Sequence, residues 1–194
     1  MLRHLAAMSI PWRAVSIVQV DERIAPPGDA DRNLTHLRES LLGHAPVSPD
    51  QVYAMPVESS DLDMAAAQYE GDLRKLAGDP PVLDLVHLGL GADGHTASLV
   101  PDDPVLHIDD VDVALSAPYQ GRSRMTLTLP ILNRARKILW VVTGSEKAEM
   151  CRRLLAGYRS IPAGRIRRDR ALLIADCAAA AAAQSLIKGE VVCA

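Results

Sequence analysis

The sequence predicts an α/β protein built on an open, mostly parallel sheet with helices on both faces. Short apolar runs rich in β-branched residues alternate along the chain with helical patterns rich in alanine and leucine. This alternation is typical of a parallel sheet covered by helices. At 194 residues, the chain is long enough to bury one core. We therefore expect a single domain over residues 1–194.

Strands are expected at the short apolar runs, which are residues 15–20, 81–90, 111–117, 124–129, 137–144 and 171–175. The run over 81–90 is the most continuous, which predicts a central strand buried on both faces of the sheet. The polar stretch 21–33 follows the first run and contains two prolines and a glycine. We expect this stretch to lack regular structure.

Helices are expected between these runs, over residues 34–43, 59–78, 145–157 and 177–189. Leucines at three- and four-residue spacing give the first helix one apolar face, and Gly43 ends it. The second opens on Ser59 and Ser60, which can cap its first turn, and closes on Gly78. The last contains six consecutive alanines, which favour a helix because alanine is the best helix former.

The charge balance argues against several classes of partner. Lys and Arg total 21 and Asp and Glu total 24, so the surface offers no broad attraction to nucleic acid or to an anionic membrane. No apolar run approaches the roughly 20 residues of a membrane span, and the N-terminus lacks the pattern of a signal peptide. We expect a cytoplasmic protein with neither kind of partner.

Cysteine and histidine usage gives little support to a metal site. The three cysteines are widely spaced and odd in number, so we interpret them as ordinary thiols rather than a disulfide framework or a metal pair. The six histidines show no spacing typical of metal ligands. We expect no metal.

Polar stretches follow three of the predicted strands, at residues 21–23, 89–95 and 143–147. Ligands of open α/β sheets bind outside the carboxyl ends of the strands, so these stretches should converge. Gly89, Gly91 and Gly94 allow tight turns and close approach of the backbone to a ligand, and N–H groups there can stabilise an anion. Their spacing departs from the dinucleotide fingerprint, because the third glycine comes one residue early.

His95 is the candidate general base. Imidazole titrates near neutral pH and can accept a proton from water, and Asp93 can hold the ring in one tautomer and stabilise its protonated form. The alternative is that Asp93 caps a short helix and His95 is an ordinary surface residue. The spacing alone does not separate these two interpretations.

Four further side chains are candidates for holding a substrate. Arg23 can bind a phosphate through two parallel hydrogen bonds, Lys147 can add a point charge, and Arg124 is a third cation. The alternative for each is a solvated surface charge. Asn33 can bond to a sugar hydroxyl, although capping a helix is the favoured interpretation.

The motifs, taken in order, resemble those of the 6-phosphogluconolactonase family. They are VDER at 20–23, DRN at 31–33, HLGLGADGHTASLVPD at 87–102 and RMTLTLPILNRARKILWVVTGSEKAEM at 124–150. The related glucosamine-6-phosphate deaminases share the D-G-H core but continue with isoleucine, alanine, phenylalanine and asparagine, whereas threonine, alanine, serine and leucine follow here. The resemblance covers residues 12 to about 176 and implies a Rossmann-like sheet of the NagB/RpiA type.

The resemblance implies hydrolysis of 6-phospho-D-glucono-1,5-lactone to 6-phospho-D-gluconate in the oxidative pentose phosphate pathway, without a metal or organic cofactor. The partner is then a small phosphorylated sugar lactone. His95 matches the family's catalytic base and Asp93 the acid that orients it. Arg23 and Lys147 match positions lining the site, and Asp21 is expected to contact hydroxyls or to fix Arg23.

One part of the family's pattern is missing from this sequence. Members usually begin with a further strand and helix, joined by an S-G-G-S-T-P loop that cradles the sugar phosphate, and the 194 residues contain no such motif. We therefore expect an N-terminally truncated sheet with an exposed apolar edge. Two alternatives to the lactonase remain: a non-catalytic phosphosugar-binding protein and, less favoured, an amino-sugar-phosphate deaminase.

Overall fold

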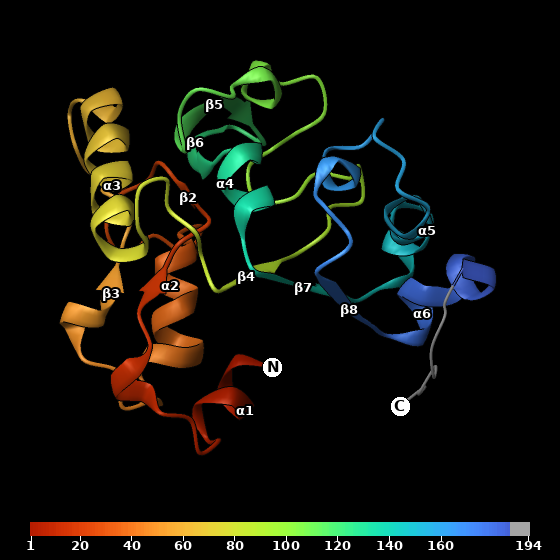
Figure 1. The fold of residues 1–194 in the computed structure, drawn as a ribbon, viewed down its shortest axis with the longest axis horizontal. Helices are drawn as coiled ribbons and strands as arrows, with labels where there is room; N and C mark the ends of the chain where they lie inside the picture. Colours follow the sequence, from red (N-terminus) through yellow and green to blue (C-terminus); the bar gives the residue numbers. More distant parts are fainter. Residues whose placement is uncertain (187–194) are drawn as a thin grey trace.

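The computed structural model describes residues 1–186, and three sheets organise them (Figure 1). The first is a parallel pair, β1 (Ile17–Val18) and β3 (Val52–Tyr53). The second is antiparallel, with β2 (Asp21–Arg23), β6 (Arg122–Leu127) and β5 (Val113–Tyr119) in that order. The third is parallel, with β4 (Leu85–Leu88), β7 (Lys137–Val142) and β8 (Ala171–Ala175) in that order. The predicted α/β class with a parallel sheet is confirmed.

The α-helices are α1 (Leu2–Ala6), α2 (Asn33–Leu37), α3 (Leu62–Ala77), α4 (Leu129–Arg134), α5 (Ala148–Ala156) and α6 (Cys177–Ala180). A π-helical turn over Arg38–Leu42 prolongs α2 up to Gly43, where the sequence predicts the end. Short 3₁₀ turns cover Trp12–Ala14, Pro49–Gln51, Pro104–His107, Ser145–Lys147, Pro162–Arg165 and Ala181–Leu186. Residues 187–189 of the last predicted helix lie outside the described residues.

Helix α3 forms because its ends are capped and one face is apolar. The Asp61 carboxylate accepts a hydrogen bond from the Met64 backbone N–H at 2.9 Å, and Gly78 ends the helix at a φ of 93°. The predicted serine cap is wrong, because the Ser59 hydroxyl instead bonds to the Asp61 backbone. Tyr69 and Leu73, four residues apart on one face, are buried.

Residues 21–23 form strand β2, although the sequence predicts no regular structure there. The strand pairs with β6, placing Asp21 opposite Thr126 and Arg23 opposite Arg124. The prolines that suggested a loop begin only at Pro26, so they leave these backbone groups free to join the ladder. The predicted strand over 15–20 shrinks to β1.

Strand β4 lies at the edge of its sheet, so the prediction of a central strand buried on both faces is wrong. Among the strands of residues 1–186, it pairs with β7 alone. Its burial alternates: Val86 and Leu88 are buried, whereas Leu85 is 58% exposed. Strand β8 alternates in the same way, with Leu172 61% and Ile174 52% exposed. Figure 1 shows α4 on one side of β4 and β7. The exposed leucines and isoleucine make the opposite side an open apolar face.

The main core joins the two larger sheets. Its buried members include Leu88 of β4, Met125 and Leu127 of β6, Ile131 of α4 and Trp140 of β7. A smaller cluster near the N-terminus packs Ala6, Trp12, Leu41 and Ala45 together. Because β4 and β6 contribute to one core, the loop after β4 is held close to the antiparallel sheet.

The prediction of ordinary thiols is confirmed at Cys151. Cys151 is a free, buried thiol. Cys193 lies outside the described residues. Within residues 1–186, no helix is long and apolar enough to cross a membrane.

Candidate active site

The loop that carries His95 begins where β4 ends and closes on itself. The Gly91 N–H donates to the His95 carbonyl at 2.8 Å, and the Gly94 N–H donates to the Gly91 carbonyl at 3.0 Å. These two N–H groups are therefore engaged inside the loop. No helix begins between residues 91 and 99, so the alternative that Asp93 caps a short helix is wrong.

Asp93 and His95 form a close pair. Asp93 Oδ1 lies 2.6 Å from His95 Nδ1 and also accepts a hydrogen bond from the His95 backbone N–H at 3.1 Å. Since an ionised carboxylate only accepts, Nδ1 carries the proton and Nε2 is left as the basic nitrogen. Burial alone would raise the pKa of Asp93, but the bonds from the His95 backbone and ring and from Tyr119 outweigh it and lower the pKa.

Two of the three glycines in this loop cannot carry a side chain without a displacement or backbone strain. A Cβ at Gly91 would lie 2.0 Å from His95 Nδ1, so any side chain there would displace the imidazole. Gly94 has a φ of 88°, and a Cβ on it would lie 2.7 Å from Cβ of Ile161. A Cβ at Gly89 would meet nothing within 4 Å. The Gly89 carbonyl accepts from the hydroxyl of Thr96 at 2.8 Å.

A second segment holds the loop from outside. The Ala163 N–H donates to the Gly94 carbonyl at 3.0 Å. Met150 of α5 also approaches, with its sulfur 3.3 Å from the place a Gly94 Cβ would take. The His95 loop is thus fixed by residues that precede β8 as well as by β4.

Tyr119, at the end of β5, contacts both members of the pair and was not singled out from the sequence. Its hydroxyl donates to Asp93 Oδ2 at 3.0 Å. Its ring meets the His95 imidazole edge to face, with centroids 5.3 Å apart and planes at 63°. The Arg124 guanidinium carbon lies 5.0 Å from the centroid of the same ring. Nothing local in the sequence links Tyr119 to a loop 26 residues earlier.

Arg23 and Arg124 stand opposite each other on β2 and β6. Arg124 is only 4% exposed, and the Nε atoms of both arginines are buried without a hydrogen-bond partner. Burial and the neighbouring Arg23 charge lower the pKa of Arg124. Two cations with unsatisfied donors at close quarters form a site suited to an anion, because an anion would supply both the missing acceptors and the missing charge.

Asp21 bonds to two neighbouring side chains. Asp21 Oδ2 accepts from the Ser98 hydroxyl at 2.7 Å, and Oδ1 accepts from the Asn33 amide at 3.0 Å. Burial raises the pKa of Asp21 despite the Ser98 hydrogen bond. The Asn33 side chain does not cap α2, whose N-cap residue is Arg32. Asp21 therefore joins β2, the start of α2 and the segment just after His95, and Ser98 is a contact the sequence did not reveal.

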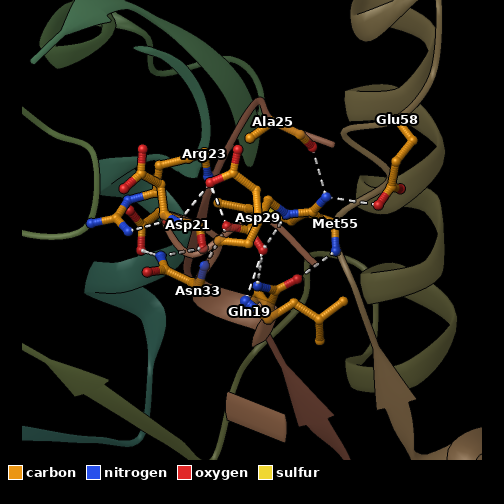
Figure 2. A network of polar contacts seen from close by, with 12 residues as sticks. Gln19, Asp21, Arg23, Ala25, Asp29, Asn33, Met55 and Glu58 are labelled. Carbon is orange, nitrogen blue, oxygen red and sulfur yellow. Dashed lines mark hydrogen bonds and ion pairs between the residues drawn. The ribbon is translucent and has the colours of Figure 1, made fainter. Parts of the chain in front are cut away.

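Behind Asp21, the fully buried Glu22 is the centre of a polar network, part of which Figure 2 shows. It accepts from the Gln19 amide at 2.9 Å and from the backbone N–H groups of Asn33 and Leu34 at 2.7 and 2.9 Å. It also pairs with the buried Arg32 at 3.0 Å. Burial alone would raise the pKa of Glu22, but these bonds lower it.

The network continues outward from Glu22 and ties α2 to neighbouring segments. Arg32 donates to the Ala25 carbonyl at 2.9 Å and to the Glu58 carboxylate at 2.7 Å. The side-chain oxygen of Gln19 accepts from the Met55 N–H at 2.9 Å (Figure 2). None of these groups reaches His95. The network fixes the backbone of β2, on which Asp21 and Arg23 are carried.

Lys147 lies in the 3₁₀ turn that follows β7. Its side chain makes no hydrogen bond or ion pair with the part of the chain that the structure describes. The turn leads directly into α5, whose Met150 approaches Gly94. Of the predicted convergence, the stretch 21–23 is joined by a side-chain hydrogen bond to Ser98, three residues beyond the stretch 89–95. The stretch 143–147 approaches the loop only through Met150 of α5.

Two shallow depressions lie away from this cluster, with volumes of about 420 and 380 Å³. Both are lined by Asn133, Arg159 and Arg165. Arg165 donates to the Arg159 carbonyl at 3.3 Å, and Arg168 of the second depression donates to the Leu155 carbonyl at 2.6 Å. These arginines brace loops, whereas the chemistry-bearing groups gather around Asp93 and His95.

The family model described as glucosamine-6-phosphate isomerases/6-phosphogluconolactonase matches residues 1–174. The chain belongs to this family. A 6-phosphogluconolactonase of Mycobacterium tuberculosis is 37% identical over 195 residues, covering 93% of this chain and 79% of that protein. One from Synechocystis is 34% identical over 147 residues, covering 74% of this chain and 61% of that protein. The chain therefore spans between about three fifths and four fifths of the length of these relatives.

A solved structure of this family confirms the fold type. The 6-phosphogluconolactonase of Thermotoga maritima superimposes with a TM-score of 0.80 at 26% sequence identity, covering 90% of this chain and 78% of that one. The predicted resemblance and the predicted NagB-type α/β architecture are both confirmed by these matches.

Proposed function

We propose that this chain hydrolyses 6-phospho-D-glucono-1,5-lactone to 6-phospho-D-gluconate, with His95 as the general base. The observation that carries the proposal is the Asp93–His95 pair, in which Nδ1 is bound by the carboxylate at 2.6 Å and Nε2 is left to accept a proton. The relatives reported above are named for this activity. The pair supplies the base that such a reaction needs at neutral pH.

In this mechanism Nε2 of His95 takes a proton from a water molecule as that water attacks the lactone carbonyl carbon. The bond between that carbon and the ring oxygen then breaks, and the imidazolium returns the proton to the departing oxygen. Asp93 stabilises the imidazolium between the two steps. The N–H groups of Gly91 and Gly94 donate within the loop, so other groups must stabilise the oxyanion.

Arg23 and Arg124 are the residues we propose for the substrate's phosphate. Their unpartnered Nε atoms support this assignment, since a phosphate would accept hydrogen bonds from both guanidinium groups. Binding the phosphate away from the reacting carbon would orient the lactone. Lys147 is proposed as a further cation for the same substrate, and Asp21 and Asn33 as the pair that keeps Arg23 in place.

The test is the rate of lactone hydrolysis above the spontaneous background, measured at slightly acidic pH. His95→Asn should lower the enzymatic rate by roughly a hundredfold or more, as expected for removal of a general base. His87→Asn is the matched control, because His87 is exposed on β4 and should leave the rate unchanged. An unaltered excess rate in a folded His95→Asn protein would contradict the assignment.

The alternative of a phosphosugar-binding protein without catalysis makes a different prediction. Titration calorimetry would then detect 6-phosphogluconate binding while the wild type and His95→Asn both hydrolyse the lactone at the background rate. We propose that the reaction needs no metal or organic cofactor, so prior dialysis against a chelator should leave the rate unchanged. The cytoplasmic location stays a prediction.

A further inference from the structure

Both oxygens of the Asp93 carboxylate are engaged, and by different parts of the fold. Oδ1 serves the His95 ring and backbone from within the same loop. Oδ2 accepts from the Tyr119 hydroxyl at 3.0 Å, and Tyr119 comes from β5 in the antiparallel sheet. A carboxylate held at both oxygens cannot rotate about its terminal torsion without breaking one of these bonds.

The Tyr119 ring makes a second, separate contribution. One contact is with the His95 imidazole, at a centroid distance of 5.3 Å. Another is with the Arg124 guanidinium, which lies 5.0 Å from the ring centroid. Arg124 also reaches the Tyr119 carbonyl at 3.5 Å. Tyr119 therefore lies between the cation proposed for the phosphate and the pair proposed for catalysis.

We propose that Tyr119 is a positioning residue of the active site, whose hydroxyl fixes Asp93 on His95 and whose ring places His95 and Arg124 relative to each other. This inference rests on the proposed function of His95. Tyr119 acts through its neighbours, and none of its contacts requires it to touch the substrate. Within residues 1–186, Asp93, His95 and Tyr119 contact one another, and Arg124 is the further charged group in contact with them, through the Tyr119 ring.

The two contributions can be separated by substitution. Tyr119→Phe keeps the ring and removes the hydroxyl, so Asp93 loses one donor. The carboxylate then attracts the imidazolium more strongly but is less well oriented. We expect kcat to fall about three- to tenfold, the loss typical of one hydrogen bond, with KM little changed. The acid limb of the pH–rate profile should move to higher pH.

Tyr119→Leu removes the ring as well, so Arg124 loses its support and KM should rise in addition to the fall in kcat. Tyr158→Phe is the matched control. Tyr158 is exposed and contacts Arg152, so loss of its hydroxyl should change neither kinetic constant. If Tyr119 served folding alone, Tyr119→Phe would lower the amount of folded enzyme and leave the acid limb of the pH–rate profile where it is. That result would overturn the inference.

A double-mutant cycle shows whether Tyr119 acts through Asp93. In an Asp93→Asn background, Tyr119→Phe should have little further effect on kcat, because the bond it removes no longer serves the pair. The same three- to tenfold loss in both backgrounds would overturn the proposal. Failure of this proposal can be told apart from failure of the proposed function. The proposed function fails if His95→Asn keeps full activity, and that measurement does not involve Tyr119.

Discussion

Strand β6 in the antiparallel sheet is buried at four consecutive residues, whereas β4 and β8 in the parallel sheet are exposed at every second residue. The antiparallel sheet also carries buried polar side chains, among them Glu22, Arg124 and Thr126. The parallel sheet presents Leu85, Leu172 and Ile174 to solvent. The antiparallel sheet thus buries polar side chains, whereas the parallel sheet exposes apolar ones.

The difference shows that the two sheets contribute differently to the core and to the candidate site. Glu22 and Thr126, which the antiparallel sheet encloses, are engaged by hydrogen-bond partners, whereas Nε of Arg124 is not. Strong electrostatic interactions are possible there because water is excluded. The parallel sheet contributes its inner face to the core and one strand end to the His95 loop. Substitutions among the enclosed polar groups should therefore cost much more than substitutions on the open face.

The largest effect is expected at the centre of the enclosed network. Glu22→Gln removes the charge that pairs with Arg32 at 3.0 Å and leaves a buried cation with one carboxylate fewer. We expect a loss of about 3 to 5 kcal/mol in the free energy of unfolding, measured by urea denaturation. Glu58→Gln is the control, because Glu58 is 43% exposed, and it should cost under about 1 kcal/mol. Equal losses would show that burial does not set the cost.

Substitutions in the His95 loop test whether activity depends on the position of the His95 ring. Gly91→Ala places a Cβ 2.0 Å from His95 Nδ1, so the imidazole must move off Asp93. We expect kcat/KM to fall by roughly a hundredfold. Gly89→Ala meets nothing within 4 Å and should keep nearly the full rate. Similar rates for the two variants would contradict the geometry of the loop.

Acid should weaken the network in a predictable direction. The pKa of Glu22 is lower in the folded chain than its ordinary value of 4.5, so the folded state binds its proton less readily than the unfolded state. The stability it contributes is present above pH 4.5 and is lost as the pH falls through the lowered pKa. Urea unfolding at a series of pH values should show the wild type and Glu22→Gln converging below that point. Parallel curves would exclude Glu22 as the source.

The smallest effect is expected on the open face. Leu172→Ser and Ile174→Ser replace side chains that are 61% and 52% exposed, so each should change the free energy of unfolding by no more than about 0.5 kcal/mol. Leu88→Ala on the buried face of the same sheet should cost about 2 to 5 kcal/mol. If Leu172→Ser costs as much as Leu88→Ala, the face is covered in solution.

Sequence reasoning found the parts of the molecule that local patterns determine. The end of helix α3 follows from the glycine that closes an alanine-rich run, and the Asp93–His95 pair follows from two residues in one loop. The motifs also identified the family, which the family match confirms. The position of β4 could not be found in this way, because an apolar run does not show how many neighbours its strand will have.

The missed site residues have a common physical cause. Tyr119 meets Asp93 across 26 residues, and Ser98 meets Asp21 across 77. Each contact depends on how β2, β5 and β6 pair, and pairing is not a property of either residue's neighbours in the sequence. Glu22 was overlooked between Asp21 and Arg23 because a carboxylate in such a run is usually solvated, whereas here it is fully buried.

The hydrogen bond from the Ala163 N–H to the Gly94 carbonyl bears on the order in which the chain acquires its shape. Residues of the His95 loop leave the ribosome long before Ala163 does, and domains form as their contacts become available during synthesis. The loop cannot be held in its final form until the segment after α5 has emerged and docked. The geometry of the Asp93–His95 pair should therefore be among the last features to appear during translation, although both residues are encoded near the middle of this sequence.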